Sequence, residues 1–158
     1  MSHPAEDPLF HVALIHPEIP QNTGNVGRMC LGVGARLHLV HPLGFRTDAA
    51  TVRRAGLDYW EHVDVVEHPD LDAFWAWVGT RRAWCLTAHA TTPYTRAPFA
   101  PGDVLVFGRE SVGLPAEVLA GRDTLRIPMT GPTRSLNLSN AAAVVAYAAL
   151  ARLRPELF

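Results

Sequence analysis

The sequence predicts an α/β domain built on a parallel sheet. Short apolar runs alternate along the chain with segments of helical pattern, and this alternation is typical of parallel strands joined by helices. The 158 residues are enough for one compact domain with one sizeable core. Because no repeat, low-complexity tract or linker divides the chain, we expect a loose leader over residues 1–8 and a single domain over residues 9–158.

Hydrophobic patterning predicts the strands. Each expected strand is a run of four to six residues rich in aliphatic or aromatic side chains, and the second run alternates apolar with polar positions. In chain order, the expected strands cover residues 10–15, 36–40, 62–66, 83–87, 103–107 and 124–127.

Capping residues and helical periodicity predict the helices. Asn22 or Thr23 is expected to cap the first helix, and Gly34 to end it. The last helix is rich in alanine and is expected to begin at a cap provided by Ser139 or Asn140. In chain order, the expected helices cover about residues 22–33, 48–55, 70–78, 114–119 and 139–153.

Composition is that of an ordinary globular protein, with 48% hydrophobic and 18% charged residues. No apolar run reaches the roughly 18–20 residues that span a bilayer. The first residues have neither the basic start nor the apolar stretch of a secretory signal. We therefore expect a cytoplasmic protein that does not act in a membrane.

Cysteines and histidines give no support to a disulfide or a metal site. Cys30 and Cys85 both have apolar neighbours, which favours two reduced thiols in the core. The eight histidines include no HExxH motif and no close pair, so we expect no metal. His62 and His68 flank the third expected strand, and we expect both to face solvent.

Charge restricts the possible functions in two ways. The net charge is −1, so bulk electrostatics do not point to nucleic acid. All fourteen basic residues are arginines, and a Walker A phosphate loop is excluded because it requires a lysine. The glycines of residues 32–37 fall at a helix end and lack the third glycine of the dinucleotide fingerprint.

Four loops of unusual composition are the candidates for chemistry. Ligands of parallel α/β sheets bind in loops beyond the carboxyl ends of the strands. The third of these loops has glycines where the backbone must turn sharply or approach a ligand, and the fourth has small polar residues before the last helix. The four loops cover residues 17–28, 87–95, 108–115 and 128–140.

Residues 22–28, 107–115 and 127–140 resemble, in order, the three motifs of the SPOUT methyltransferases. Residues 17–25 and 53–59 are similar to the members that methylate ribose at the tRNA wobble position, and the likeness extends over residues 10–153. It implies 2'-O-methylation of a wobble cytidine or modified uridine with S-adenosylmethionine, a deep trefoil knot near the C-terminus, and a homodimer that binds tRNA. The chain departs from the family pattern at His89 and Arg109.

The resemblance also implies a catalytic set. Methyl transfer to a ribose hydroxyl is an in-line displacement, which requires a positioned hydroxyl and an electrostatic match to the shifting charge. Arg28 matches the arginine assigned to activating that hydroxyl, and since a guanidinium is a poor base, we expect it to orient the hydroxyl and stabilise the alkoxide. Asn22 is expected to shape the same loop, as a contact or as a helix cap. Glu110 is expected to hold Arg28 or an amide of the third motif, with a carboxylate that only orders a loop as the alternative. Asn137 is also counted with the catalytic residues.

Apolar residues at strand ends are expected to sandwich the adenine of the cofactor, while backbone groups bind its edge. Simple membership of the core is the alternative for the apolar members of this set. The predicted cofactor residues are Leu86, Gly108, Ile127, Met129, Ser135 and Leu138.

Arg53 and Arg54 are expected to grip phosphate, and Tyr59 to stack on an anticodon base. Tyr147 is expected to line the dimer cleft. Solvated surface charge, or a place in the core for Tyr147, is the structural alternative.

Other functions remain open at this point. A ribosomal-RNA 2'-O-methyltransferase would carry the same three motifs. A non-catalytic RNA-binding protein of this fold is disfavoured by the intact Arg28 and Glu110, and a small-molecule methyltransferase by the arginine pair at Arg53 and Arg54.

Overall fold

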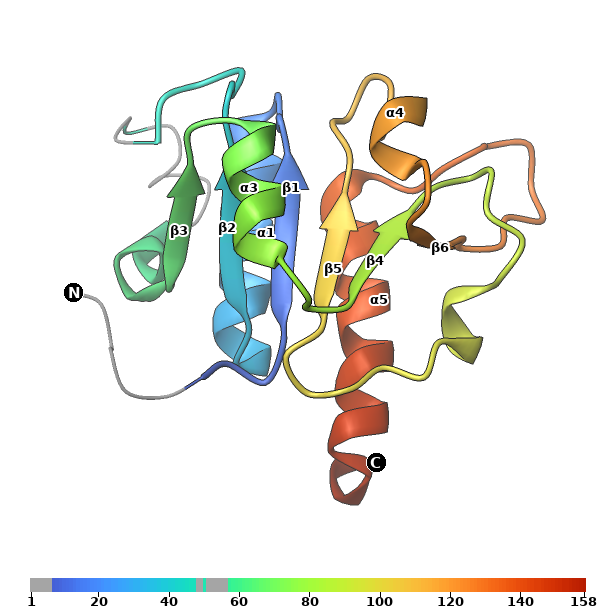
Figure 1. Cartoon of the computed structure of the whole chain (residues 1–158). Coiled ribbons are helices and arrows are strands. Elements are labelled where there is room, and N and C mark those ends of the chain that lie inside the picture. Colours follow the sequence, from blue (N-terminus) through green and yellow to red (C-terminus); the bar gives the residue numbers. More distant parts are fainter. Residues whose placement is uncertain (1–6, 48–49, 51–56) are drawn as a thin grey trace.

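A six-stranded sheet forms the centre of the computed structural model, which describes residues 7–47, 50 and 57–158 (Figure 1). The strand order is β3-β2-β1-β5-β4-β6, and every neighbouring pair runs parallel. The predicted parallel α/β architecture is therefore confirmed. The strands are β1 (His11–Ile15), β2 (Arg36–Val40), β3 (Val65–His68), β4 (Ala83–Leu86), β5 (Val104–Phe107) and β6 (Asp123–Leu125).

Helices cover both faces of the sheet. In Figure 1, α3 lies in front of the strands, α1 and α5 lie behind them, and α4 lies at their upper end, packed in the same cluster as α3. None of the described helices combines the length and apolar character needed to cross a bilayer. The helices are α1 (Pro20–Val33), α3 (Leu71–Val78), α4 (Ala116–Leu119) and α5 (Leu138–Leu153), with short 3-10 turns η1 (Leu57–His62), η2 (Tyr94–Arg96) and η3 (Pro155–Leu157).

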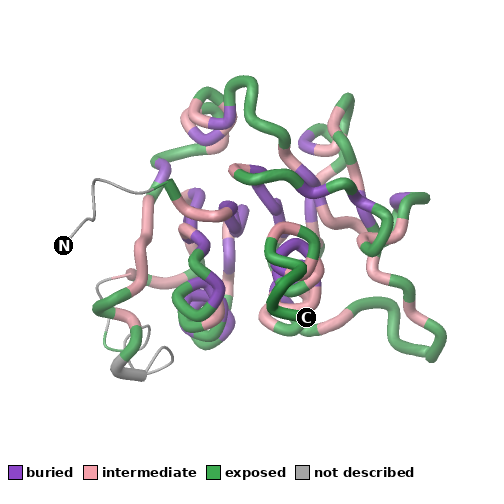
Figure 2. Tube along the Cα trace, turned by 90° about the horizontal axis from the view of Figure 1, so that it is seen from below, coloured by how far each residue is buried: buried purple, intermediate pink, exposed green. Residues whose placement is uncertain are grey.

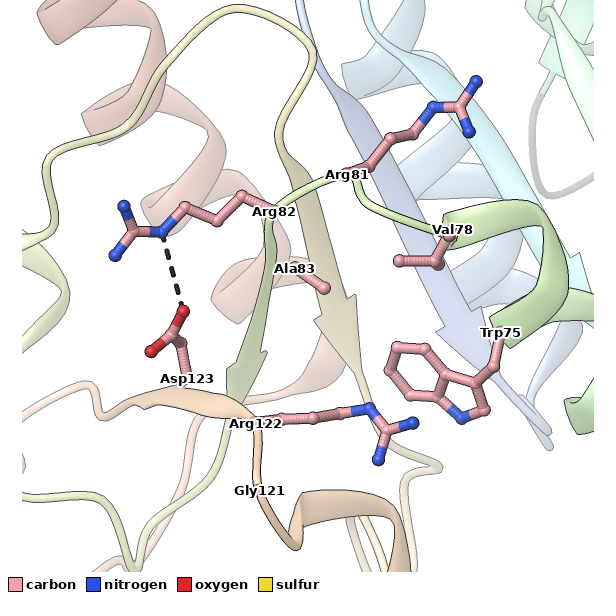
Figure 3. Close-up of a pocket in the computed structure, with 9 residues that line it drawn as sticks. Trp75, Val78, Arg81, Arg82, Ala83, Gly121, Arg122 and Asp123 are labelled. Carbon is pink, nitrogen blue, oxygen red and sulfur yellow. Dashed lines mark ion pairs between the residues drawn. The ribbon is translucent and has the colours of Figure 1, made fainter.

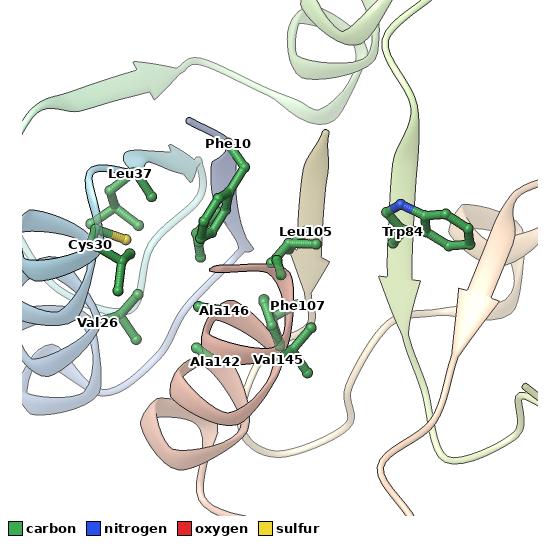
Figure 4. Packing of buried hydrophobic residues seen from close by; sticks show 14 of the residues in the cluster. Phe10, Val26, Cys30, Leu37, Trp84, Leu105, Phe107, Ala142, Val145 and Ala146 are labelled. Carbon is green, nitrogen blue, oxygen red and sulfur yellow. The ribbon is translucent and has the colours of Figure 1, made fainter. Parts of the chain in front are cut away.

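The core has two layers, one on each side of the sheet. Phe10 and Leu14 pack with Val26 of α1 and Val145 of α5 on the rear face (Figure 4). Ala13 and Ile15, which point to the other side of β1, pack against α3 and α4 on the front face. All five residues of β1 are buried, as expected of a central parallel strand (Figure 2).

The two cysteines are free and buried, as predicted. Cys30 lies in the rear layer and Cys85 in the front layer. Burial raises the pKa of the Cys85 thiol to about 11 and also raises the pKa of the Cys30 thiol, so both are poor nucleophiles.

The predicted helix caps are wrong at two starts. Helix α1 has Ile19 as its N-cap and Pro20 in its first turn, so Asn22 and Thr23 lie inside the helix. Proline suits that first turn because its φ is preset and it has no N–H to satisfy. Helix α5 is capped by Asn137, two residues before the predicted Ser139.

Among the other helix and strand ends, one agrees with the prediction and others differ by a few residues. Gly34 ends α1 as predicted, with a left-handed φ of 77°. Strand β3 begins at Val65, later than predicted, because the turn η1 extends to His62. Strand β6 ends at Leu125, two residues early. The predicted helix over residues 48–55 lies outside the described residues except for one position, and the first six residues of the predicted leader also lie outside them.

His62 is exposed as predicted, whereas the prediction for His68 is wrong because that ring is buried. It ends a row of three histidines on the front face of the sheet. His11 Nδ1 lies 2.9 Å from His38 Nε2, and His38 Nδ1 lies 2.9 Å from His68 Nε2. The indole of Trp77 packs on all three rings.

The environment of this histidine row disfavours protonation. Burial, assisted by the positive charges of Arg36 and Arg81, lowers the pKa of His11 to about 4. Burial and the neighbouring rings lower the pKa of His38 to about 2, and burial lowers that of His68. Neutral rings satisfy one another, since each can donate from one nitrogen and accept at the other.

Candidate functional site

The motif loops meet at the carboxyl edge of the sheet, the upper edge in Figure 1. Because β1, β5, β4 and β6 are parallel, the loops that follow them emerge on the same side. These loops span residues 16–19, 108–115, 87–93 and 126–137. Three of the four predicted loops lie at this edge, whereas most of the predicted loop over residues 17–28 is helical because α1 begins at Pro20.

Glu110 holds the start of α1. Its Oε1 accepts from the backbone N–H of Glu18 at 2.8 Å, and its Oε2 accepts from Ile19 N–H at 2.8 Å and from Asn22 Nδ2 at 3.2 Å. Free N–H groups at a helix start attract an anion, which explains this choice of partner. Glu110 therefore orders the segment before α1, as the structural alternative expected, and its hydrogen bonds among the described residues do not reach Arg28 or the third motif.

Arg28 lies exposed on α1, with its guanidinium carbon 4.6 Å from the centre of the Tyr59 ring. A Cβ at Gly27 would lie 2.8 Å from Trp60 Cζ3, so the absence of a side chain there allows η1 to pack closely on α1. That contact brings Tyr59, the neighbour of Trp60, beneath Arg28. The structure thus joins a predicted catalytic residue to a predicted RNA-binding residue through a cation–π contact.

Gly108 is required by its own loop. A Cβ at this position would lie 2.2 Å from the carbonyl carbon of Gly113 and 2.4 Å from Leu114 N. Gly113 itself has a left-handed φ of 69°, and its N–H donates to Arg109 O at 2.8 Å. The space beside Gly108 is therefore filled by backbone, so any contact with a cofactor must use its backbone atoms.

Three of the predicted cofactor residues belong to the rear layer of the core. Leu86 at the end of β4, Ile127 beyond β6 and Leu138 at the start of α5 pack in the same rear cluster. Met129 is half-buried in the loop between Ile127 and α5, and Ser135 is exposed there. This combination of an apolar wall and a polar loop has the chemistry that an adenosine group requires.

Asn137 caps α5 through its side-chain oxygen. Its Oδ1 accepts from Ser139 N–H at 2.9 Å and from Ser139 Oγ at 2.7 Å. Its amide nitrogen is the part of the side chain that remains for a substrate. Tyr147 is exposed further along α5, whereas Arg53 and Arg54 lie outside the described residues.

Sequence reasoning did not identify Glu18, Ser111 or the environment of Thr23. The carboxylate of Glu18 contacts Ser111 across the loops. Within the described part of the chain, Thr23 Oγ1 is a buried polar atom without a hydrogen-bond partner. Two signals for Glu18 were available: its position in a loop three residues after a strand, and its place in the stretch 17–25 that carries the family likeness.

A hollow at the amino edge of the sheet is separate from these loops (Figure 3). It has a volume of about 260 Å³ and lies where β4 and β6 begin. Its arginines are engaged by neighbouring side chains: Arg122 lies over the Trp75 ring at 3.6 Å, and Arg82 pairs with Asp123 at 3.6 Å. No predicted site residue lines it, and the described residues contain no cluster of three side chains suited to a metal ion.

Comparisons with known proteins agree on the class of this chain. Residues 9–147 match the SpoU rRNA Methylase family. A relative from Saccharophagus degradans, named tRNA (cytidine(34)-2'-O)-methyltransferase, is 47% identical over 148 residues, which cover 92% of this chain and 96% of the relative.

Solved structures give the same result. One that describes the 2-OH methylation of C/U34 on tRNA has a TM-score of 0.91 and 46% identity, covering 95% of this chain and 99% of that one. The SpoU methyltransferase AviRb from Streptomyces viridochromogenes, in complex with the cofactor AdoMet, has a TM-score of 0.79 and 25% identity, covering 98% and 60%.

The family predicted from the three motifs is therefore confirmed. The match extends over most of the chain and includes all three motif loops. The fold shared with the first of these structures covers 95% of this chain. The chain belongs to the SpoU methylase family.

Proposed function

We propose that this protein transfers a methyl group from S-adenosylmethionine to the ribose 2'-hydroxyl of the wobble nucleotide, a cytidine or modified uridine, in the tRNA anticodon. The observation that carries this proposal is the nearly full-length likeness, at 47% identity, to a relative named tRNA (cytidine(34)-2'-O)-methyltransferase. The match covers 92% of this chain and 96% of that relative.

Arg28 is the proposed catalytic residue. Bound S-adenosylmethionine supplies a methyl group activated by a sulfonium. The exposed guanidinium of Arg28 can donate hydrogen bonds to the ribose oxygen and stabilise the negative charge that develops on it. A guanidinium stays protonated at physiological pH, so Arg28 orients the hydroxyl and stabilises the charge on its oxygen, while the hydroxyl proton passes to solvent water. Its position over Tyr59 restricts its motion before the RNA arrives.

The cofactor is proposed to bind between the loops that follow β4, β5 and β6. Leu86, Ile127 and Leu138 provide the apolar side, and the AdoMet-bound relative supports a cofactor of this class. Ser135 and Met129, on the loop that precedes α5, complete the proposed site together with the backbone of Gly108.

We also propose a trefoil knot in this part of the chain. Thr87 N–H donates to Leu125 O at 2.9 Å, while Arg126 N–H donates to Thr92 O at 2.9 Å. Successive residues of a strand direct their backbone groups to opposite sides. The end of β6 is thus flanked on both sides by the segment that follows β4, as expected if the chain passes through that segment before α5.

A homodimer is proposed on the rear face of the molecule. The two neighbouring helices there carry exposed apolar residues, with Leu31 of α1 40% exposed and Tyr147 of α5 49% exposed, and Phe158 at the chain end is 72% exposed. Burial of these side chains against a second copy would remove apolar area from water. Sedimentation at micromolar concentration should give a mass near twice 17.3 kDa, and a fully active monomer would contradict the dimer.

The direct test maps 2'-O-methylation in total RNA from a deletion strain. We expect the methyl group to disappear at position 34 of particular tRNAs and to return with the wild-type gene but not with Arg28→Ala. Loss in ribosomal RNA instead would favour the ribosomal alternative, and an unchanged methylation map would favour a non-catalytic RNA-binding protein. Because the enzyme would find its tRNA substrate in the cytoplasm, we propose a cytoplasmic location for it.

A further inference from the structure

Two carboxylates link the loop after β1 and the loop after β5 in opposite directions. Glu110 of the second loop accepts from the backbone of Glu18 and Ile19. Glu18 of the first loop has an Oε1 that accepts from Ser111 N–H at 2.9 Å and from Ser111 Oγ at 2.7 Å. Glu110 therefore binds the backbone of Glu18 and of the next residue, and Glu18 binds the backbone of the residue after Glu110, although the two carboxylates lie more than 90 positions apart.

A third loop supports the Glu18 backbone from the other side. Gly44 N–H donates to Pro17 O at 2.9 Å, and a Cβ at Gly44 would lie 2.8 Å from Glu18 Cα. His16, just before, has a left-handed φ of 54°, with its N–H donating to Val40 O at 3.0 Å. The segment between β1 and α1 is thus held on both sides, and the Glu18 side chain is its link to the loop of the second motif.

We propose that Glu18, with Ser111 as its partner, is a positioning residue for methyl transfer. The inference rests on the proposed function and on Arg28 as the catalytic residue. Glu110 fixes the start of α1, and Glu18 in turn fixes the backbone segment that carries Glu110. The reciprocal pair therefore sets α1, and Arg28 with it, relative to the loops proposed to hold the methyl donor.

We call Glu18 and Glu110 the carboxylate clamp. The clamp lies at the start of α1, away from Arg28, so it can affect methyl transfer without touching the substrate. Arg28 lies eight residues after Pro20, about 12 Å along the helix axis at roughly 1.5 Å per residue. Release of the helix start allows α1 to tilt, which displaces Arg28. A misplacement of about 1 Å can cost about 100-fold in rate, far more than it costs in binding.

The charge of Glu18 suits this role. Hydrogen bonds from the Ser111 hydroxyl and backbone hold the pKa of Glu18 below its usual value, and the positive charge of Arg109 acts in the same direction. The carboxylate is ionised at neutral pH, and hydrogen bonds to an ionised acceptor are shorter and stronger than neutral ones.

The test compares Glu18→Ala and Ser111→Ala with Glu117→Gln, a control that changes an exposed carboxylate on nearby α4. Single-turnover rates are measured with saturating tRNA and S-adenosylmethionine, and Kd for each ligand and Tm are measured separately. We expect Glu18→Ala to lose about 10- to 100-fold in rate while both Kd values stay within about twofold. Ser111→Ala keeps its backbone N–H and should lose less, and Ser111→Thr should restore the rate.

A double variant tests whether the two residues act together. Because Ser111 is proposed to act through Glu18, Glu18→Ala with Ser111→Ala should be no slower than Glu18→Ala alone. Independent, multiplying losses would overturn the proposed pairing. If Glu18→Ala misfolds, Glu18→Gln retains the shape with a weaker acceptor, and we expect an intermediate rate from it.

The outcomes separate this proposal from the proposed function. A wild-type enzyme that methylates tRNA, together with variants that turn over normally at saturation, would overturn the clamp alone. Losses that follow only from weaker cofactor binding or from a smaller folded fraction would overturn it as well. A wild-type protein with no tRNA methylation would overturn the proposed function, and the clamp with it.

Discussion

Two polar clusters lie at opposite ends of β1 and differ in kind. The histidine row that begins at His11 is buried and neutral, and it joins strands that are neighbours in the sheet. The carboxylate clamp of Glu18 and Glu110 is charged and accessible, and it joins loops far apart in the sequence. The first arrangement contributes to stability and the second to the placement of a helix. Lowering the pH should therefore act mainly on the stability of the fold, whereas substitutions near the start of α1 should act mainly on the rate of methyl transfer.

Acid should act on the histidine row and produce the largest change. The folded-state pKa values of His11 and His38 lie below the ordinary 6.5, so the unfolded chain takes up protons first as pH falls below 6.5. Stability is therefore present above that pH and is lost as pH decreases. Between pH 7.5 and 5, each residue should cost about 2 kcal/mol in the free energy of unfolding, or about 4 kcal/mol for both.

Urea unfolding at the two pH values measures this effect. His11→Gln should remove about half of the pH dependence, whereas His62→Gln, at an exposed position, should leave it unchanged. Equal stability of the wild-type protein at pH 5 and pH 7.5 would contradict the account of the row.

Substitution of Arg28 should act on catalysis alone. Arg28→Ala is expected to lose about 100- to 1,000-fold in single-turnover rate, the usual effect of removing one donor to a developing negative charge. Binding of S-adenosylmethionine and the free energy of unfolding should remain close to wild type, because Arg28 is exposed and its recorded contact is the Tyr59 ring. A normal rate at saturation would remove Arg28 from the catalytic set.

Glu110→Gln should lower both the stability of the fold and the rate of methyl transfer, and so tests whether the start of α1 links the two. It replaces a charged acceptor of three hydrogen bonds at the start of α1 by a neutral amide. We expect a loss of about 2 kcal/mol in unfolding free energy, together with a lower rate at saturation. A loss of stability with an unchanged rate would mean that the start of α1 does not control the site.

Asn137 should give the smallest change in stability. Asn137→Ala removes the α5 cap and should cost about 1 kcal/mol, whereas Asn137→Asp keeps the capping oxygen and should cost little. If Asn137→Asp is stable but slow in methyl transfer, the amide nitrogen contacts substrate or cofactor. If both variants turn over normally in the folded state, Asn137 is a cap only.

Sequence patterns correctly predicted the structural features that depend on neighbouring residues. The order of strands and helices, the Gly34 helix end and the meeting of the motif loops all follow from periodicity and from parallel strands. The cap of α1 could not be read locally, because its acceptor comes from Glu110, about 90 residues further along. The burial of His68 was missed because the predicted third strand ended at residue 66, whereas β3 extends to His68 and so places its ring within the sheet.

Helix α1 has a composition that would scarcely sustain a helix in isolation. Its 14 residues include Gly24, Gly27 and Gly32, and a glycine inside a helix costs about 1 kcal/mol relative to alanine. A peptide of this length is marginal in water even when its residues favour helix. The segment that carries Arg28 therefore takes its helical form from Trp60, α5 and the sheet around it, so the arginine proposed to be catalytic becomes ordered only as the tertiary structure forms.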